Sequence, residues 1–208
     1  MTRPATLGQL KESGYEVLPV KEEIRRNAIK KMAAEHPKVV EEIVPKLLSL
    51  GLVHRIFQNL LRERISIRDA ATILEAAGEA SLTTKNVILI TEYVRQAIRR
   101  SVVEPFLDRD ETLKAYMLDA SLDEAVASAV QHGEVTSHLS LAPNLVREFM
   151  TKIQSQVGAP ATPVAVIVSS GARYFFQQLA ESALKNVFFL AHGDLPPSMR
   201  VVSLGVIR

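Results

Sequence analysis

The spacing of apolar residues changes near Val103, and this change limits the folds open to the chain. Before Val103, apolar residues recur every three or four positions, as they do over residues 53–61, which is the period of an amphipathic helix. After it, short β-branched runs such as residues 163–168 alternate with helical segments, a pattern typical of helices packed on a sheet. We therefore expect a mixed α and β protein, with an N-terminal all-α helical subdomain followed by a small α/β (α+β) subdomain whose sheet has about four strands.

The predicted organisation has three parts. Residues 1–19 contain two prolines and two glycines with little periodicity, and we expect an irregular N-terminal arm there. Residues 20–103 are expected to form the helical subdomain and residues 104–208 the α/β subdomain. Charge changes at the same boundary: residues 1–103 hold 17 Lys/Arg against 12 Asp/Glu, and residues 104–208 hold 8 against 11. This asymmetry indicates a boundary between subdomains more than it indicates a ligand.

Prolines, glycines and capping residues divide the helical subdomain. A first helix is expected from residue 20 to the His36-Pro37 step, because a residue before proline is pushed out of the helical region. Short helices are expected over residues 37–44 and 46–50, the second ending at Gly51 as its C-cap. Three further helices are expected to bury one stripe each: Val53, Ile56, Phe57, Leu60 and Leu61; Ile73, Leu74 and Ala77, capped by Ser66; and Val87, Ile90, Val94, Ala97 and Ile98, capped by Thr83 or Thr84.

The α/β subdomain is expected to follow the order β-α-α-β-α-β-β. Strands are predicted over residues 112–119, 163–168, 187–190 and 201–207. Ser121 with Glu124 resembles a capping box, and its helix is expected to include Ala129 and Val130 and to end at Gly133. A long helix should begin at Pro143, and another should run from Ser170-Gly171 to Leu184.

Several kinds of chemistry are excluded by residues that the chain lacks. It has no cysteine, which excludes disulfides, thiolate metal sites and cysteine nucleophiles. It has no phosphate-binding glycine pattern and no G-x-S-x-G elbow, and its five histidines lack the i,i+4 spacing of metalloenzymes. We therefore predict no catalytic residue, no cofactor and no metal, and hence no enzyme.

Composition favours a folded, soluble chain that does not bind nucleic acid. Apolar residues make up 47% and charged residues 23%, which excludes wholesale disorder. No apolar run approaches the roughly 18–20 residues of a membrane helix, and the first residues lack the apolar core of a signal peptide. Basic pairs such as Arg99-Arg100 alternate with glutamates, aromatic residues are only 5% and Trp is absent, so we expect no nucleic-acid partner.

One turn offers an alternative function. Ser169-Ser170-Gly171 lies between a predicted strand and a predicted helix, so its backbone N–H groups would face an anion at the helix N-terminus, and Arg173 would assist. The alternative is a small anion- or nucleotide-binding enzyme domain that uses the Ser169–Arg173 turn. The simpler interpretation is that Ser170 caps the helix.

Several motifs resemble one known family. They are P-K-V-V-E-E-I-V-P at residues 37–45, Q-N-L-L-R-E-R-I-S-I-R-D at 58–69, T-E-Y-V-R-Q-A at 91–97, and V-V-S-L-G-V-I at 201–207 after Pro196-Pro197. Together they resemble the FlhA/InvA family, the export-gate proteins of flagellar and type III secretion systems. The similarity covers about residues 20–208, and residues 62–69 favour a flagellar over a virulence system.

The resemblance implies a function that composition does not. Members of that family carry membrane helices and a cytoplasmic region of four subdomains, and this chain resembles the last two. These regions form a homo-oligomeric ring, typically of nine subunits, at the cytoplasmic face of the bacterial inner membrane. There they contact other export-apparatus proteins and receive chaperone–substrate complexes. The resemblance therefore implies a non-enzymatic part of a protein-export gate that acts in ring assembly and docking.

Six charged residues of the helical subdomain are the candidate site. Arginine pairs with carboxylates through a planar fork, and two explanations of the cluster remain open. It is either an internal salt-bridge network or a contact between subunits of a ring, since heterologous contacts close rings. The candidate oligomer or partner contacts are Arg62, Arg64, Arg68, Asp69, Glu92 and Arg95.

Overall fold

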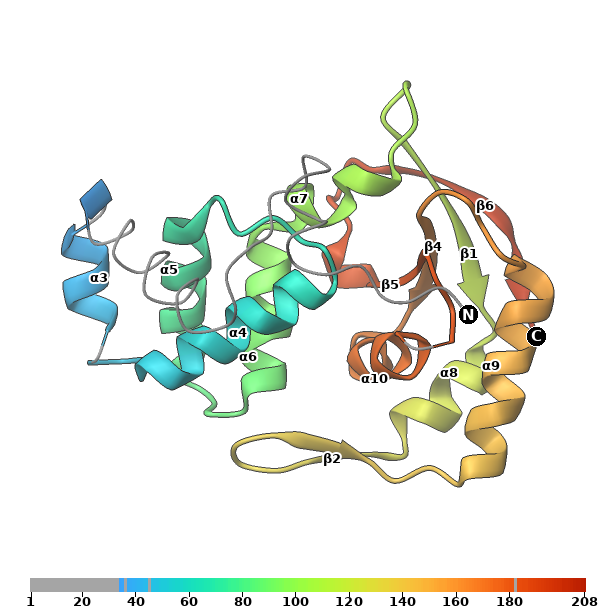
Figure 1. Ribbon diagram of the computed structural model, residues 1–208, viewed down its shortest axis with the longest axis horizontal. Helices are drawn as coiled ribbons and strands as arrows, with labels where there is room; N and C mark the ends of the chain where they lie inside the picture. Colours follow the sequence, from blue (N-terminus) through green and yellow to red (C-terminus); the bar gives the residue numbers. More distant parts are fainter. Residues whose placement is uncertain (1–33, 36, 45, 182) are drawn as a thin grey trace, which may run out of the picture.

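The computed structural model describes residues 34–35, 37–44, 46–181 and 183–208. The predicted arm over residues 1–19 and nearly all of the first predicted helix lie outside the described residues. We call residues 37–103 the helical unit and residues 104–208 the α/β unit (Figure 1).

The helical unit packs short helices around leucine and isoleucine side chains. Leu48, Ile56, Leu60, Ile73 and Ile90 are fully buried at its centre. This burial explains why the apolar period of three to four residues predicts the unit well. Its helices are α3 (Pro37–Ile43), α4 (Leu50–Arg62), α5 (Ala70–Ser81), α6 (Val87–Ala97) and α7 (Arg99–Val103), followed by the 3-10 turn η1 (Glu104–Phe106).

The prediction of a separate helix over residues 46–50 is wrong. The chain turns there, and the amides of Leu47 and Leu48 both donate to the carbonyl of Ile43, which inserts Leu48 into the core. Ser49 then caps α4 by accepting a hydrogen bond from the amide of Leu52 at 3.2 Å. Gly51 is therefore in the first turn of α4 and is not a C-cap.

The capping residues of α5 and α6 also differ from the prediction. Asp69 caps α5, while Ser66 only accepts from the amide of Arg68. Asn86 caps α6, and Thr84, two residues earlier, accepts from the amide of Asn86. Asp and Asn are at least as good N-caps as Ser and Thr, and each lies directly before its helix.

Two members of the predicted apolar stripes are on the surface. Leu61 at the end of α4 and Ala97 at the end of α6 are both exposed. Each lies in the last turn of its helix, where the periodic pattern continues but no neighbouring element covers the side chain. The other stripe residues are buried.

The α/β unit is built on four parallel strands, as predicted in number. The strand order is β5-β4-β1-β6, with Ala115 opposite Ala165 and Val166 opposite Phe189. The near-continuous apolar runs of β4 and β5 follow from burial on both faces. The elements are β1 (Thr112–Leu118), α8 (Ala120–Ala127), β2 (Val130–His132), β3 (Ser137–Leu139), α9 (Pro143–Val157), β4 (Val164–Val168), α10 (Ser170–Ala180), β5 (Val187–Ala191), the 3-10 turn η2 (His192–Asp194) and β6 (Arg200–Ile207).

The connections place the helices of this unit on one face of the sheet. The crossovers from β1 to β4 and from β4 to β5 each move one strand in the same direction, and right-handed crossovers then put their helices on the same side. In agreement, α10 contacts both α8 and α9. One contiguous core of buried apolar residues runs through both units.

A β-hairpin that the sequence pattern does not predict follows α8. Asp119, not Ser121, caps α8 by accepting from the amide of Ser121, and α8 ends at Ala127 instead of reaching Gly133. Ala129 and Val130 then leave the helix, and β2 pairs with β3 in an antiparallel hairpin. At Gly133 an added Cβ would lie 2.8 Å from the carbonyl oxygen of Thr136, so the turn is too close for a side chain.

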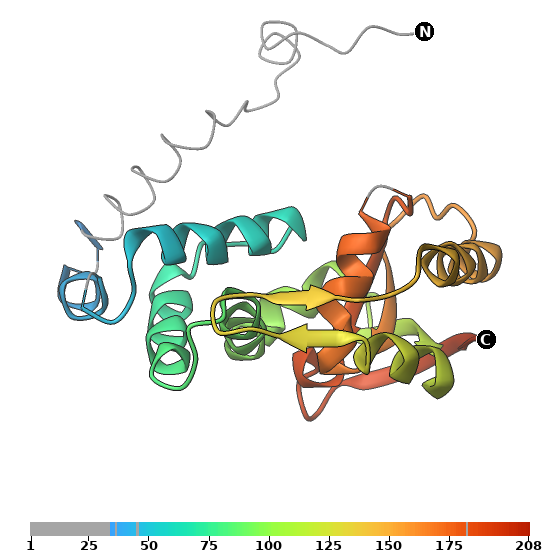
Figure 2. The ribbon, with the colours of Figure 1, turned by 90° about the horizontal axis from the view of Figure 1, so that it is seen from below.

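The hairpin joins the two units. It extends from the α/β unit across α6 (Figure 2). The amide of Val87 donates to the carbonyl of Val135 at 3.0 Å, and the Asn86 side-chain amide donates to the Gly133 carbonyl at 2.8 Å and the Ser137 hydroxyl at 2.9 Å. Asn86 is therefore both the N-cap of α6 and the anchor of the hairpin.

The last helix is shorter than predicted. α10 ends at Ala180 and not at Leu184, and Leu184 is buried outside it. Asn186 adopts a positive φ of 62° directly before β5, which redirects the chain into the sheet. No described helix is both long enough and apolar enough to span a bilayer.

Candidate functional site

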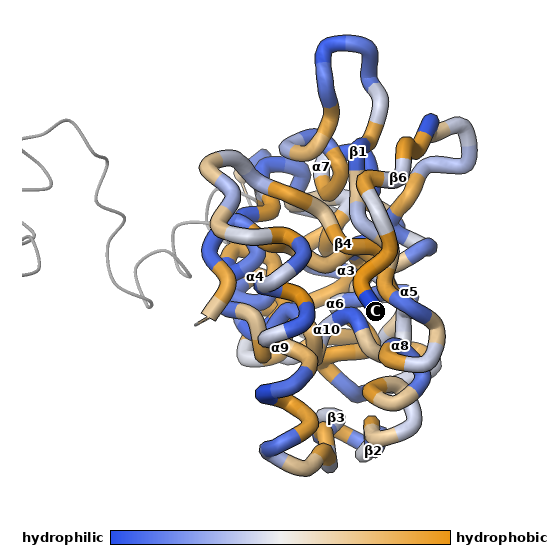
Figure 3. The backbone as a smooth tube through the Cα atoms, turned by 90° about the vertical axis from the view of Figure 1, so that its right-hand side faces the viewer, coloured by the Kyte–Doolittle hydropathy of each residue, from blue (hydrophilic) through white to orange (hydrophobic). Residues whose placement is uncertain are grey.

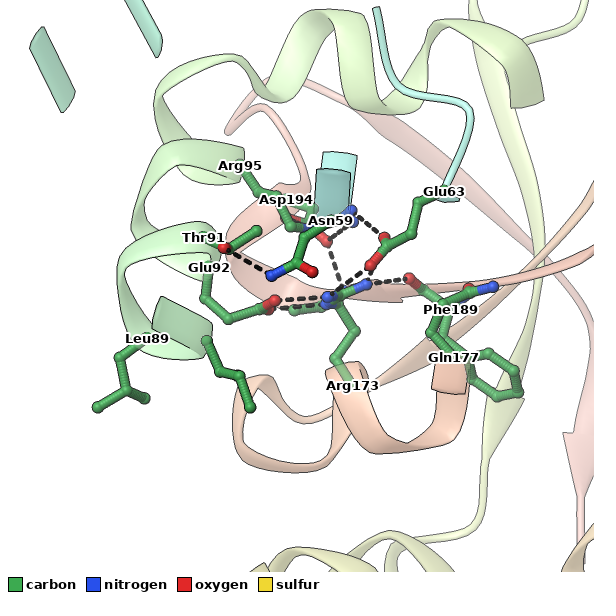
Figure 4. A network of polar contacts seen from close by, with 12 residues as sticks. Asn59, Glu63, Leu89, Thr91, Glu92, Arg95, Arg173, Gln177, Phe189 and Asp194 are labelled. Carbon is green, nitrogen blue, oxygen red and sulfur yellow. Dashed lines mark hydrogen bonds and ion pairs between the residues drawn. The ribbon is translucent and has the colours of Figure 1, made fainter. Parts of the chain in front are cut away.

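Five charged side chains meet where the two units pack together (Figure 4). They come from four elements that are distant in the sequence. We call them the ion cluster: Glu63 at the end of α4, Glu92 and Arg95 on α6, Arg173 on α10, and Asp194 in η2.

Arg173 contacts two carboxylates through the whole fork of its guanidinium. Its Nε donates to Glu92 Oε2 at 2.7 Å, and its Nη2 donates to Glu92 Oε1. Its Nη1 and Nη2 donate to the two oxygens of Glu63 at 2.7 and 3.1 Å. Bidentate pairs of this kind combine charge with fixed geometry, so Arg173 holds α4 and α6 of the helical unit against α10.

Arg95 forms the second half of the ion cluster. Its Nε and Nη2 donate to the two oxygens of Asp194 at 3.2 and 2.6 Å, and its Nη1 donates to Glu63. Asp194 also accepts from the amide of Ala191 at 2.9 Å, which fixes the turn after β5. Glu63 thus bridges both arginines, and the five side chains form one connected network.

The ion cluster is almost completely removed from water. The side chains of Arg173, Arg95 and Asp194 are at most 1% exposed, and those of Glu63 and Glu92 are 9% and 12% exposed. Two guanidinium groups face three carboxylates, which leaves a formal surplus of one negative charge. Burying an unpaired charge is costly, so this surplus must be relieved by the environment or by a proton.

Burial and pairing shift the pKa values of two groups in the ion cluster. Burial raises the pKa of the Glu92 carboxyl above its ordinary 4.5, and attraction to Arg173 offsets only part of that shift. Burial alone would lower the pKa of Arg173, but the Glu63 and Glu92 carboxylates hold it well above its ordinary value. Arg173 is therefore permanently charged, and Glu92 is the acid whose ionisation is opposed.

A helix-ending turn directs Glu63 inward. The amide of Ile65 donates to the carbonyl of Leu60, and the amide of Arg64 donates to that of Leu61, which is the Schellman arrangement at a helix C-terminus. Arg64 occupies the left-handed position of this turn with φ of 59°, where glycine is usual. The buried Ile65 provides the apolar contact that accompanies the motif.

The structure divides the six predicted site residues into two groups. Glu92 and Arg95, one turn apart on α6, lie in the ion cluster. The other four are exposed and lie outside it: Arg62, Arg64, Arg68 and Asp69. Whether any of the six contacts another subunit or a partner stays a prediction.

Two of the exposed four have internal roles. Arg64 Nη1 donates to Asn186 Oδ1 at 3.2 Å, and its guanidinium lies 5.3 Å from the centre of the Phe188 ring, so it also joins the two units. Asp69 caps α5.

Three members of the ion cluster were not among the predicted residues. Glu63 lies inside the quoted 58–69 motif, but exposed glutamates are so common on helices that its type alone carried no signal. The sequence indicates Arg173 only as an anion ligand beside the Ser169–Gly171 turn. Asp194 lies in a 3-10 turn without periodicity, and only the folded chain brings it to Arg95.

The structure opposes the anion-binding alternative at the Ser169–Arg173 turn. The amide and hydroxyl of Ser169 both donate to the carboxylate of Asp123, at 2.7 and 2.9 Å. Arg173 points into the ion cluster and is fully buried. The chain's own carboxylate therefore occupies this helix start. Ser170 is also not the cap, because Ser169 holds that position and its hydroxyl is bound to Asp123.

Within the described ranges, no three His, Asp or Glu side chains gather in an arrangement that could hold a metal ion. The same part of the chain contains no buried side-chain nitrogen or oxygen without a hydrogen-bond partner. The buried polar groups at the junction are satisfied by one another, as the side chains of Asn59 and Thr91 illustrate at 3.2 Å.

Comparison with known families places the chain. A model of the FHIPEP family matches residues 8–200. The chain belongs to the FHIPEP family. This confirms the family expected from the motifs, because relatives in it are named flagellar biosynthesis protein FlhA.

Two curated FHIPEP relatives show the extent of the match. Flagellar biosynthesis protein FlhA of Bacillus subtilis is 27% identical over 202 residues, which cover 96% of this chain and 30% of that protein. Low calcium response locus protein D of Yersinia pestis is 27% identical over 186 residues, which cover 88% of this chain and 26% of that protein. The chain therefore spans less than a third of the length of either relative.

Several solved structures share the fold. The Chlamydia pneumoniae CdsV protein superimposes with a TM-score of 0.81 at 27% identity, over 88% of this chain and 53% of that chain. CdsV in a complex with CdsO also gives a TM-score of 0.81, at 26% identity, over 96% of this chain and 58% of that chain. Nonameric SctV-C from EPEC gives a TM-score of 0.77 at 21% identity, over 88% of this chain and 56% of that chain, and shares the fold. The mixed α and β fold class is confirmed.

Proposed function

We propose that this FHIPEP chain is a non-enzymatic assembly and docking module in the cytoplasmic part of a flagellar or type III protein-export gate. The observation that carries the proposal is the family match over residues 8–200, with relatives named for flagellar biosynthesis and the low calcium response. Its place would be the cytoplasmic face of the bacterial inner membrane.

The geometry fits a rigid module. The ion cluster and the β2–β3 hairpin both cross the junction, so α6 is held at its start by Asn86 and at its middle and end by Glu92 and Arg95. A subunit of a closed ring has to keep its two contact surfaces at a fixed angle, because small errors in orientation accumulate around the ring. A rigid junction supplies that property.

We infer that the chain self-assembles into a ring through charged residues outside the ion cluster. Structures of related chains are described as nonameric, which supports nine as the expected number. Arg62, Arg68 and Asp69 are exposed and form the proposed contact, whereas Arg64 is already engaged with Asn186 and Phe188.

Native mass spectrometry of the full chain across a range of concentrations tests the ring. We expect oligomers up to nine subunits, and we expect Arg68→Ala and Asp69→Asn to reduce them without changing the melting temperature. Asn keeps the capping oxygen of α5 while it removes the charge. Arg147→Ala, an exposed arginine on α9, is the control. A chain that stays monomeric, or variants that assemble like the control, would refute the proposal.

Docking is tested separately. We expect chaperone–substrate complexes of a flagellar system, and other export-apparatus proteins, to bind the immobilised chain; CdsV has been captured with the protein CdsO. The measurement is surface plasmon resonance with the complex and with the chaperone alone. Equal or absent responses would contradict the docking part while leaving ring assembly untouched.

A further inference from the structure

The strand β6 exposes apolar side chains at the edge of the sheet. Val201, Val202, Leu204 and Val206 are each 38–46% exposed. At the opposite edge, every residue of β5 is buried. Exposed apolar residues are ordinary when scattered singly, but here four of them lie within one strand of eight residues.

The backbone of β6 is also available for pairing. In the described part of the chain, β1 is the one strand that pairs with β6, and β6 is last in the strand order. Figure 3 shows β6 running along the outside of the molecule to the C-terminus. An edge strand presents unpaired N–H and C=O groups, which can add a further strand by β-augmentation.

A bulge limits the regular part of this edge. Ala115 pairs with Ser203 but Tyr116 pairs with Gly205, so Leu204 is an extra residue in β6. Gly205 has φ of 150°, which favours glycine. The bulge therefore divides β6 into regular stretches at residues 200–203 and 205–207, and an added segment that reaches both ends has to follow the kink at Leu204, which disfavours a long fibril-like edge.

The charges around β6 favour one kind of binding partner at this edge. Arg200 and Arg208 are exposed at the two ends of the strand, and Lys114 on β1 lies opposite Val202. A second copy pairing antiparallel would bring the arginine ends of the two strands together, which is unfavourable. Lys114 pairs with Asp108 at 3.1 Å, whereas β6 itself contains Arg200 and no Asp or Glu, and Arg208 follows it directly with Asp119 as an acidic neighbour.

We propose that β6 is a docking edge for an extended segment of another protein that alternates apolar residues and has Asp or Glu at both ends. The segment would pair with the β6 backbone, place apolar side chains beside Val202 and Leu204, and direct its acidic ends to Arg200 and Arg208. This inference does not depend on ring assembly, because it uses no residue of the proposed ring contact.

The test is fluorescence anisotropy of three labelled peptides with the full chain. The first alternates Val and Thr between Asp-Glu ends, the second has Lys-Lys ends, and the third is the acidic peptide with alternate backbone nitrogens methylated. We expect the acidic peptide to bind with Kd below about 1 mM, which is the weak end of specific recognition. The lysine peptide should bind at least tenfold more weakly, and the methylated peptide should not bind.

Variants locate the binding. Leu204→Glu and Val202→Glu should each lower the affinity for the acidic peptide at least tenfold. Val135→Glu, which changes an exposed valine on the hairpin turn, should leave that affinity unchanged. Melting temperatures verify that each variant folds. Equal binding to all three variants, or to the acidic and lysine peptides, would overturn the proposal.

Pairing of β6 with either of two other segments would also overturn the proposal. One is a second copy, which would appear as a concentration-dependent dimer that Leu204→Glu abolishes. The other is a segment of the same chain, which would appear, in the dilute monomer without peptide, as slow exchange of those amides in residues 200–203 that do not pair with β1.

Discussion

Arg173 is the residue whose loss should cost most stability. Arg173→Met removes the guanidinium that pairs bidentately with both Glu63 and Glu92, and it leaves three carboxylates against one guanidinium in a buried site. Removing one partner of a buried pair costs about 3–5 kcal/mol. Urea unfolding measures the change in the free energy of unfolding.

The matched control for Arg173 is Arg62→Met, which removes an exposed arginine from the end of α4. Exposed substitutions of this kind usually stay within about 0.5 kcal/mol. Similar losses in the two variants would mean that the ion cluster adds nothing beyond general arginine packing.

Glu92 gives stability a specific pH dependence. Its folded-state pKa is raised above 4.5 by burial, so the folded chain binds the proton more readily than the unfolded chain. The stabilising contribution of Glu92 is then fully present below pH 4.5 and is lost as the pH rises through the raised folded-state value. We expect the stability of the native chain relative to Glu92→Gln to increase as the pH falls through the raised folded-state pKa toward 4.5.

Unfolding in urea at a series of pH values from 7.5 down to 4.5 measures this difference. Glu75→Gln, at an exposed position on α5, should show a constant difference from the native chain over the same range. A constant difference for Glu92→Gln as well would contradict the opposed ionisation of that buried carboxyl.

At the scale of elements, Asn86 combines two functions that substitution can separate. Its Oδ1 caps α6 through the amides of Ile88 and Leu89, and its Nδ2 anchors the hairpin. Asn86→Asp keeps a capping oxygen but turns a carboxylate toward the Gly133 carbonyl, whereas Asn86→Ala loses both functions.

We expect Asn86→Asp to speed amide hydrogen exchange in residues 130–139 while α6 stays protected, and Asn86→Ala to speed exchange in both. Loss of the cap alone costs about 0.5–2 kcal/mol. Unchanged exchange of the hairpin in Asn86→Asp would show that the hairpin is held by other contacts.

At the scale of the whole molecule, the two units should unfold together. They share one contiguous apolar core, and the ion cluster and the hairpin add polar links across the junction. We expect far-ultraviolet circular dichroism and tyrosine fluorescence to report one coincident urea transition. Two separated transitions would show that the junction is weaker than its contacts indicate.

Much of the order of helices and strands is predictable, because the spacing of apolar residues follows which side chains are buried. Ile56, Leu60, Ile73 and Ile90 repeat at the helical period, and each is buried. The runs of β4 and β5 are apolar because both faces of those strands are covered. The family motifs at residues 37–45 and 58–69 could likewise be identified without a structure.

The junction could not be predicted in the same way. Arg173 and Asp194 are single polar residues in segments whose pattern describes only their own helix or turn, and their partners lie 81 to 110 positions away for Arg173 and 99 for Asp194. The hairpin was missed because Val130 continues an apolar helical spacing, and its strands form only by pairing with each other and docking on Asn86.

The sequence by itself determined most of the helices, the four strands of the main sheet and the family, because these depend on the period of apolar residues and on contiguous motifs. The tertiary structure alone decided that Glu92 and Arg95 face inward while Arg62 and Arg68 face water. The physical reason is that a charge can be buried only where opposite charges from distant segments are brought to it, and sequence spacing within one helix does not contain that information.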